Sequence, residues 1–522
     1  MMKLRLVAGT LFALLILQCL RGQELRTVQV QTADGVLEGV ISADGNVRTF
    51  KGIPYAAPPL GPFRWKAPQP VVPWSGVRKA VNFGKRAMQV HIWDDMIFHD
   101  DGPSEDCLYL NLWMPENSRG AKLPVMVWIH GGGFAAGSSS EGRQDGGNLS
   151  KKGVLVVSMN YRLGVFGFLA LPGLSKESDH GASGNYGLMD QLAALKWVKA
   201  NIATFGGDPD NVTIFGESAG SSSVSALVAS PLAKGLFKRA IGESGALFGG
   251  MRSREDAESL GTHFVDSAFG KISLEELRAM PAAKILQAAA SRPMSEFKPV
   301  VDGYFLPESC DSIYAAGLQN QVALLVGWNR DEGNYDAFFG KIDPTMANYR
   351  VIARSKFGTR ADEFLRLYPA STDAEAKRSA QDYETDRAAR RAGWKWLEAH
   401  LKTGGSPVYR YIYDHPLPLP ADAKPGTEPM APHACEIEYV FLMLSSKQLP
   451  WRQDDYTVSE ILATYWTNFA KTGDPNGEGL PQWPMYTPAE NYPVMHIDVC
   501  PAAAADMQRE RHEFVDREGI QQ

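Results

Sequence analysis

Five apolar, β-branched runs recur at long intervals along this chain of 522 residues, and helix-compatible segments separate them. The runs lie at 125–129, 154–159, 212–215, 322–326 and 408–413. A strand that is apolar on both faces is typical of a buried parallel sheet, because helices cover both of its sides. Strand and helix alternate over most of the chain. The sequence therefore predicts an α/β fold with a large, mostly parallel central sheet flanked by helices.

The segment 27–50 predicts a small N-terminal antiparallel sheet, because alternating runs there are separated by Asp-Gly turns at 34–35 and 44–45. Helices are expected at 188–200 and 218–229. The stretch 252–292 is rich in helix formers and is expected to cap the sheet. No repeat and no Pro- or Ser-rich linker divides the chain. A single domain over residues 23–522, with helical insertions, is therefore predicted.

Residues 1–22 have the pattern of a secretory signal peptide. Lys3 and Arg5 form a basic start, and the apolar stretch 6–17 is too short to cross about 30 Å of hydrocarbon as a helix. An N-terminal anchor or a buried helix remains the alternative. The signal predicts a secreted or periplasmic protein whose mature chain has no integral membrane segment.

The charge and the cysteine content of the chain limit which ligands and partners are expected. The net charge is −6 and no basic stripe is present, so nucleic acid is not an expected partner. No Cys or His pair has metal-ligand spacing, and neither a metal nor a cofactor is expected. Export would permit disulfides among the four cysteines that follow the signal, but the spacing does not choose among three full pairings. These four cysteines are Cys107, Cys310, Cys435 and Cys500. The oligomeric state is not predicted.

The motif that carries chemistry is Gly216-Glu-Ser-Ala-Gly220, which lies between a β run and a helix-compatible run. This is Gly-x-Ser-x-Gly in the strand–turn–helix context of a nucleophile elbow. The sharp turn exposes Ser218 at a helix N-terminus, where the dipole favours developing negative charge. A second Gly-Glu-Ser, in Gly242-Glu-Ser-Gly-Ala246, has its following glycine one residue early. Ser244 is therefore interpreted as the end of a sheet strand and not as a nucleophile.

A nucleophilic serine of this kind needs hydrogen-bond donors for the oxyanion that forms. The strand at 125–129 runs into His130-Gly-Gly-Gly133, where consecutive glycines leave backbone N–H groups uncovered. Gly132, Gly133 and Ala219 are the expected donors. A flexible glycine turn is the alternative, and His130 is expected to be structural.

Three longer segments of the sequence are similar to those of a known enzyme family. The chain resembles the type B carboxylesterases, α/β-hydrolases that include the cholinesterases, over nearly its whole mature length. The resemblance rests on 50–59 with Phe63-Arg-Trp65, on 104–111, and on the serine signature at 205–220. It implies an α/β-hydrolase fold, activity on small-molecule esters and a Ser-His-Glu triad.

The remaining triad residues follow from that resemblance. An Asp-Glu-Gly turn after the run 322–326 indicates Glu332 as the acid, with Asp331 as the rival. The stretch 431–441 indicates His433 as the base, with His415 as the rival. The order Ser218, Glu332, His433 agrees with that of α/β-hydrolases.

One departure concerns the cleft rim. The family's usual cysteine partner of Cys107 is replaced by Ala87, so Cys107 is expected to lack that disulfide. Cys435 could pair with Cys310 or Cys500, or be a buried thiol. Trp328 and Phe134 are expected to line the cleft.

The sequence therefore predicts a secreted serine carboxylic-ester hydrolase that acts through an acyl-enzyme. The alternative is a catalytically inactive cholinesterase-like binding or adhesion module, because this fold also serves that role. The presence of all three triad residue types favours the enzyme. The natural ester and the acyl-chain preference are not predicted.

Overall fold

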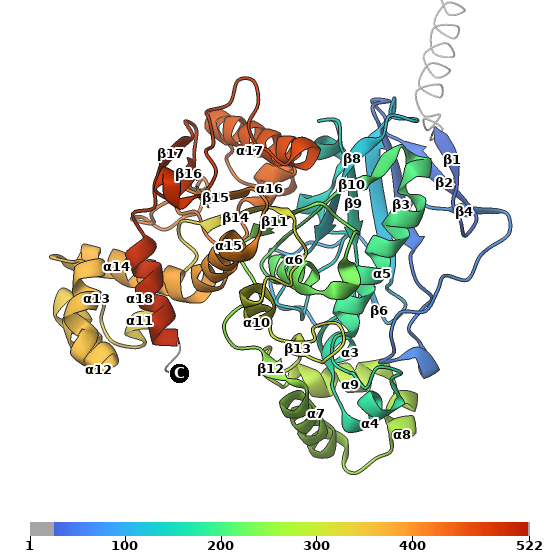
Figure 1. The fold of residues 1–522 in the computed structure, drawn as a ribbon, viewed down its shortest axis with the longest axis horizontal. Coiled ribbons are helices and arrows are strands. Elements are labelled where there is room, and N and C mark those ends of the chain that lie inside the picture. Colours follow the sequence, from blue (N-terminus) through green and yellow to red (C-terminus); the bar gives the residue numbers. More distant parts are fainter. Residues whose placement is uncertain (1–25, 520–522) are drawn as a thin grey trace, which may run out of the picture.

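The computed structural model describes residues 26–519, so the predicted signal peptide at 1–22 lies outside the described residues (Figure 1). The strands are β1 Thr27–Gln31, β2 Val36–Ile41, β3 Val47–Pro54, β4 Val77–Lys79, β5 Arg86–Ala87, β6 Pro103–Ser104, β7 Tyr109–Pro115, β8 Leu123–Ile129, β9 Leu155–Met159, β10 Gly207–Glu217, β11 Arg239–Glu243, β12 Arg252–Ser253, β13 Val300–Val301, β14 Ala323–Asn329, β15 Val408–Tyr413, β16 Pro493–Ile497 and β17 Ala502–Ala505.

The helices are α2 Gly147–Ser150, α3 Gly164–Phe168, α4 Pro172–Glu177, α5 Tyr186–Asn201, α6 Ala219–Ala229, α7 Arg254–Phe269, α8 Leu274–Ala279, α9 Ala282–Ala290, α10 Cys310–Ala315, α11 Tyr335–Phe339, α12 Met346–Phe357, α13 Ala361–Leu367, α14 Asp373–Thr385, α15 Arg391–Thr403, α16 Ile437–Val440, α17 Gln453–Thr472 and α18 Arg509–Gly519. No helix within 26–519 is both long and apolar enough to span a bilayer.

Within the described residues, thirteen strands form one sheet in the order β1-β2-β3-β7-β9-β8-β10-β11-β14-β15-β16-β17, with β4 beside β2. The pairs from β9 to β16 are all parallel, whereas β1, β2, β3 and β7 pair antiparallel. All five apolar runs are central strands, as predicted. The N-terminal strands are antiparallel as predicted, and β7, which the sequence reading missed, joins them to the central sheet.

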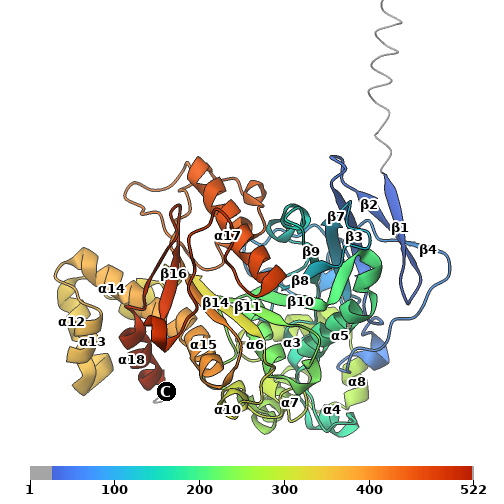
Figure 2. The same cartoon turned by 45° about the horizontal axis from the view of Figure 1, so that its top comes forward.

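Side chains alternate between the two faces of the central strands, and each face has its own core. In β8, Val125, Val127 and Ile129 pack on one side and Met126 and Trp128 on the other. The first side packs against α5, α6 and α15, and the second against α16 and α17. Figure 2 shows α17 on one side of the sheet and α5, α6 and α15 on the opposite side. Coverage on both faces explains why these strands are apolar throughout.

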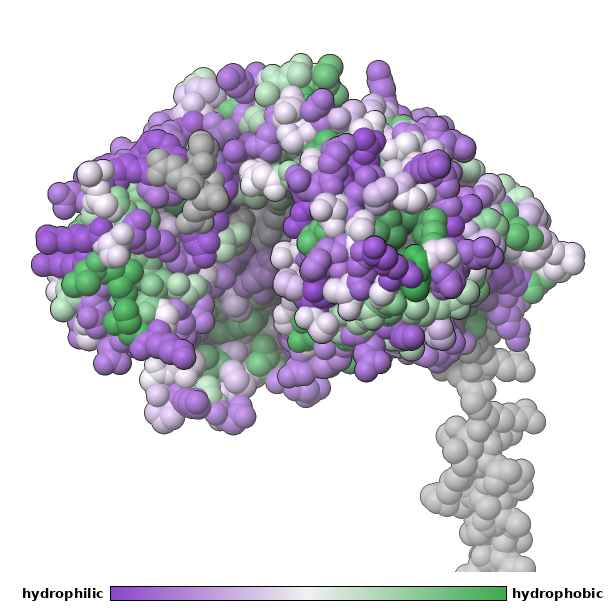
Figure 3. All heavy atoms as spheres, turned by 90° about the horizontal axis from the view of Figure 1, so that it is seen from below, coloured by the Kyte–Doolittle hydropathy of each residue, from purple (hydrophilic) through white to green (hydrophobic). Residues whose placement is uncertain are grey.

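The helices α11 to α14 and α18 form an outlying unit with its own aromatic core (Figure 1). Phe364 is central to this core, since its ring lies within 4.3–6.1 Å of Phe357, Phe338, Tyr383 and Phe514. In the space-filling view, a hollow separates this unit, at the left, from the larger right-hand part of the molecule (Figure 3). The predicted helical stretch 252–292 contains α7, α8 and α9, as expected.

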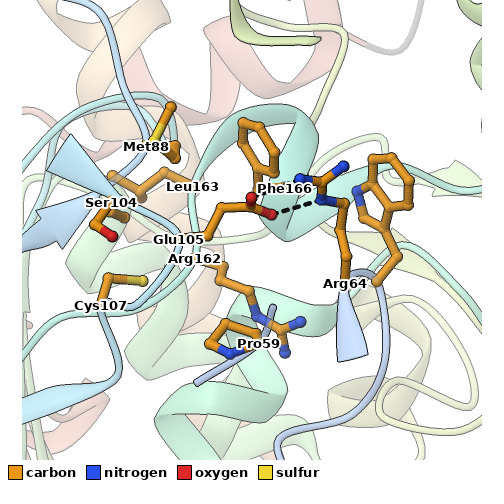
Figure 4. Close-up of a pocket in the computed structure, with 11 residues that line it drawn as sticks. Pro59, Arg64, Met88, Ser104, Glu105, Cys107, Arg162, Leu163 and Phe166 are labelled. Atoms are coloured by element: carbon orange, nitrogen blue, oxygen red, sulfur yellow. Dashed lines mark hydrogen bonds and ion pairs between the residues drawn. The ribbon is translucent and has the colours of Figure 1, made fainter. Parts of the chain in front are cut away.

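Arg64, which lies between β3 and β4, forms hydrogen bonds to the C-terminal end of α8. Its guanidinium forms two 2.6 Å bonds to Glu105 and donates to the carbonyls of Arg278 and Met280 at 2.8 and 2.7 Å. Figure 4 shows this pair at a small cavity of about 10 Å³ that Ala87 and Cys107 also line. Cys107 therefore lies beside Ala87 as a buried thiol, and burial raises its pKa.

The four cysteines among the described residues are free thiols, with Cys107, Cys310 and Cys435 buried and Cys500 exposed. Pairing of Cys435 with Cys310 or Cys500 is therefore not found. The buried-thiol alternative describes Cys435, whose Sγ accepts a bond from Asn329 Nδ2 at 3.6 Å.

Candidate active site

Ser218 occupies a strained turn between β10 and α6. Its backbone has φ 56° and ψ −118°, and it is the residue that precedes the first turn of α6. The flanking glycines are required by close packing: a Cβ on Gly220 would lie 1.9 Å from the Ile129 carbonyl oxygen, and one on Gly216 would lie 2.6 Å from it. Ser218 remains partly exposed although the residues beside it are buried. The motif therefore folds as an elbow, for the steric reason that the sequence indicated.

The glycine loop after β8 lies directly against this elbow. A Cβ on Gly131 would lie 3.2 Å from Ser218 Cβ and 2.7 Å from Glu217 Oε2. Gly132 and Gly133 have φ values of 99° and 60°. Within residues 26–519, the amides of Gly132, Gly133 and Ala219 donate no hydrogen bond. Three unused donors thus gather beside the serine, an arrangement suited to binding an oxyanion.

His130, by contrast, is buried beneath the loop and has a structural role. Its ring stacks on Tyr161 with centroids 4.5 Å apart, and its Nδ1 lies 2.9 Å from the Gly131 carbonyl. Burial lowers its pKa to about 4, so the ring is neutral at physiological pH.

The structure brings Glu332 and His433 together, although they are 101 residues apart in sequence. His433 Nδ1 lies 3.0 Å from Glu332 Oε2, and the backbone N–H of Asn329 donates to Glu332 Oε1 at 2.6 Å. The Glu332 side chain is fully buried, whereas that of His433 is 42% exposed. Burial opposes the charge of Glu332, but His433 and the hydrogen bonds keep its pKa below the usual range.

The other ring nitrogen, His433 Nε2, lies 3.1 Å from Glu217 Oε1, which belongs to the residue before Ser218. In the described part of the chain no hydrogen bond joins Ser218 and His433. Hydrogen bonds between a nucleophile and its base are often long in unliganded enzymes and shorten when substrate is bound. The imidazole therefore connects the acid to the elbow.

The two rival residues are engaged elsewhere. Asp331 accepts the Ala431 amide at 2.9 Å and pairs with Arg378 at 2.6 Å. His415 lies between Asp498 at 2.6 Å and Asp455 at 3.0 Å. Within the described residues neither rival forms a hydrogen bond or ion pair with Ser218 or with the other proposed triad residues.

Three further buried carboxyl groups belong to this region, and two of them, Glu217 and Glu436, act on the imidazole of His433. Burial raises the pKa of Glu217 to about 7 and that of Glu436 to about 8, and it raises the pKa of Glu243 well above its usual value. Burial of His433 favours its neutral form, but the carboxylates of Glu217 and Glu332 outweigh this and raise its pKa. The charge of Glu217 therefore favours the protonated form of His433, and the protonation of each group depends on that of the other.

Sequence reasoning missed the role of Ser244. Its hydroxyl donates to Glu332 Oε1 at 2.6 Å, and its backbone has φ 56°. It does follow a sheet strand, β11, as expected. The repeated Gly-Glu-Ser on adjacent strands was the signal that could have indicated a paired role.

The expectation for Trp328 was wrong. This side chain is fully buried in the core, where it lies 4.6 Å from the Arg410 guanidinium and packs edge-on to His512. It lies on β14, one of the central strands whose two faces are covered. Phe134, with φ 58°, follows the glycine loop and is also largely buried.

Comparison with known proteins agrees with this architecture. The carboxylesterase family profile matches residues 26–515. The chain belongs to the carboxylesterase family. It is therefore a carboxylic-ester hydrolase with the α/β-hydrolase fold. It is 37% identical over 476 residues to a fumonisin B1 esterase of Sphingopyxis macrogoltabida, covering 87% of this chain and 84% of that one.

Two further relatives support this membership. Identity to the para-nitrobenzyl esterase of Bacillus subtilis (strain 168) is 36% over 476 residues, which covers 88% of this carboxylesterase and 92% of the relative. A solved PNB esterase structure superposes with a TM-score of 0.79 at 34% identity, covering 93% and 99% of the two chains.

Proposed function

We propose that this carboxylesterase is exported and hydrolyses esters through Ser218, His433 and Glu332, with the amides of Gly132, Gly133 and Ala219 as the oxyanion hole. The observation that carries the proposal is the convergence at one elbow. The glycine loop with its unused amides packs against a strained, partly exposed serine, and the residue before that serine contacts an imidazole that is paired with a buried carboxylate.

The reaction follows from this geometry. Ser218 Oγ attacks the ester carbonyl carbon while His433 Nε2 takes the hydroxyl proton, and Glu332 stabilises the imidazolium. The carbonyl oxygen becomes an oxyanion that accepts hydrogen bonds from the amides. The C–O bond breaks, and the departing alcohol takes the proton from His433. Water then attacks the acyl-Ser218 ester in the same way and releases the carboxylic acid.

Ester hydrolysis coupled to covalent labelling tests the proposal. The purified protein is assayed on 4-nitrobenzyl esters of rising acyl length, chosen because one relative is named a para-nitrobenzyl esterase. It is then treated with a fluorophosphonate and digested, and the labelled peptide is identified by mass spectrometry. We expect turnover, one label on Ser218, and loss of both in Ser218→Ala.

A folded protein that neither turns over an ester nor takes the label would support the binding-module alternative. Label on Ser244 in place of Ser218 would contradict the assignment of the nucleophile. Export is tested separately by expressing the full chain and sequencing the N-terminus of the protein outside the cytoplasm. A start at residue 23 is expected, and an intact residue 1 would contradict cleavage.

A further inference from the structure

Lys298 lies beside the glycine loop without a charged partner. It belongs to the segment between α9 and β13, it is half-buried, and its Nζ donates to the Gly133 carbonyl. Its ammonium is 5.4 Å from the centre of the Phe134 ring. A Cβ on Gly133 would lie 3.6 Å from Lys298 Nζ and 2.9 Å from Met294 Sδ. This segment therefore packs directly on the proposed oxyanion hole.

The charge of Lys298 is not neutralised within residues 26–519, since no carboxylate oxygen lies within ion-pair distance of its Nζ. The two nearest acidic residues in sequence are already engaged. Glu296 pairs with Arg292 at 2.9 Å, and Asp302 Oδ1 accepts the amides of Tyr304 and Leu306 at 3.1 and 2.9 Å. Burial lowers the pKa of Lys298 to about 8, which leaves it mostly charged at neutral pH. An ammonium has three donors, and the Gly133 carbonyl uses one.

Partial burial disfavours the charge of an ammonium that has no counter-ion, and an anionic group of a ligand at Nζ would offset that cost. We propose that Lys298 is a specificity-determining residue, and that the esterase favours esters whose acyl group ends in a carboxylate, such as half-esters of short dicarboxylic acids. This rests on the proposed function, because the ester carbonyl must lie in the hole formed by Gly132, Gly133 and Ala219.

The spacing sets the length of the acyl group. The amide nitrogen and carbonyl oxygen of Gly133 are three bonds, or about 3 Å, apart, so Nζ lies within roughly 6 Å of that amide. A four- or five-carbon diacid spans such a gap between its ester carbonyl and its free carboxylate. The other side chains that contact Gly132 and Gly133 are apolar: Met294 packs on Gly133, and Met96 Cε lies 3.3 Å from a Cβ placed on Gly132.

A matched substrate pair tests the proposal. The acidic substrate is 4-nitrobenzyl hydrogen glutarate, and its neutral counterpart is 4-nitrobenzyl glutaramate, in which an amide replaces the carboxylate. We expect the wild-type kcat/KM to favour the glutarate by about tenfold or more, as for a charge-assisted hydrogen bond. Lys298→Met should remove that preference, measured as the ratio of kcat/KM for the two esters, mainly by raising KM for the glutarate. Lys298→Arg should retain much of it. Lys284→Met, on the exposed face of α9, is the control.

Two results would overturn the role proposed for Lys298, and a third would concern only the nucleophile. A wild type that treats both esters alike overturns the proposal. So does a Lys298→Met protein that loses kcat equally on both, since Lys298 would then only hold the glycine loop. Hydrolysis of the neutral ester that persists in Ser218→Ala would instead contradict the proposed nucleophile and leave the Lys298 result to be judged by itself.

Discussion

Two Gly-Glu-Ser segments end neighbouring strands of the sheet, but their serines differ in exposure and in the structure that follows them. Gly216 pairs with Gly242, and Glu217 with Glu243, in the parallel register of β10 and β11. Both serines that follow have φ 56°. Ser218 then begins α6 and is partly exposed, whereas Ser244 is 4% exposed and is not followed by a helix.

The difference lies in what each segment packs against. Gly220 comes two residues after Ser218 because the Ile129 carbonyl leaves no room for a side chain at that position. Gly245 comes one residue after Ser244 because a Cβ there would lie 2.4 Å from the Ser218 carbonyl oxygen. The second segment therefore supports the first. The same tripeptide and the same backbone angle give a candidate nucleophile in one place and a positioning residue in the other.

The largest expected effect separates the two serines. Ser218→Ala should lower kcat by about 10⁴-fold or more, because the proposed mechanism has no other nucleophile. Initial rates on a 4-nitrobenzyl ester measure this, with circular dichroism to establish that the fold is retained. Retention of more than a tenth of the activity would mean that Ser218 is not the nucleophile.

Glu332 is the residue on which the second segment and His433 converge, so its replacement should rank next. Glu332→Gln keeps the size of the side chain but removes the charge that stabilises the imidazolium, and kcat should fall by about 10³- to 10⁴-fold. Asp331→Asn, which alters the neighbouring rival carboxyl, is the control for kcat. A larger loss of kcat in Asp331→Asn than in Glu332→Gln would reverse the assignment of the acid.

Ser244→Ala should have an intermediate effect. It removes one 2.6 Å hydrogen bond to Glu332 Oε1, while the Asn329 amide still donates to the same oxygen. A hydrogen bond to a charged group contributes about 1.5–3 kcal/mol, so kcat should fall by about tenfold or somewhat more. Ser244→Thr, which keeps the hydroxyl, should recover part of the loss. A Ser244→Ala protein as inactive as Ser218→Ala would break the distinction between the two segments.

The fold was largely predictable from the sequence because central strands in a sheet covered on both faces must be apolar throughout. The elbow was predictable for a similar reason, since Gly216 and Gly220 report close backbone contacts that no other residue permits. β7 was missed because its run, Tyr109–Pro115, is interrupted by Asn111 and ends in proline.

Contacts between distant segments could not be predicted. Nothing within Gly242-Glu-Ser-Gly-Ala246 indicates that Ser244 faces Glu332, because β14 brings the acid there from 88 residues away. The misplacement of Trp328 has the same cause, since its neighbours Arg410 and His512 lie on a different strand and on the C-terminal helix. Charge at His433 is likewise set by Glu217, which belongs to another element.

The smallest effect distinguishes the two glutamates. The Glu217 carboxylate, 3.1 Å from His433 Nε2, raises the pKa of His433, and the neutral imidazole is the form that can accept the serine proton. Removing that charge should lower this pKa, so Glu217→Gln should move the acidic limb of the kcat/KM–pH profile down by about one unit. Glu243 instead accepts a bond from Trp466 Nε1 at 2.9 Å, and burial raises its pKa, whereas the carboxyl groups that raise the pKa of His433 are those of Glu217, Glu332 and Glu436. Glu243→Gln should therefore leave the limb in place. Equal shifts in the two variants would show that the limb reports the general burial of carboxyl groups around the elbow. An upward shift in Glu217→Gln would contradict the inference that the charge of Glu217 raises the pKa of His433.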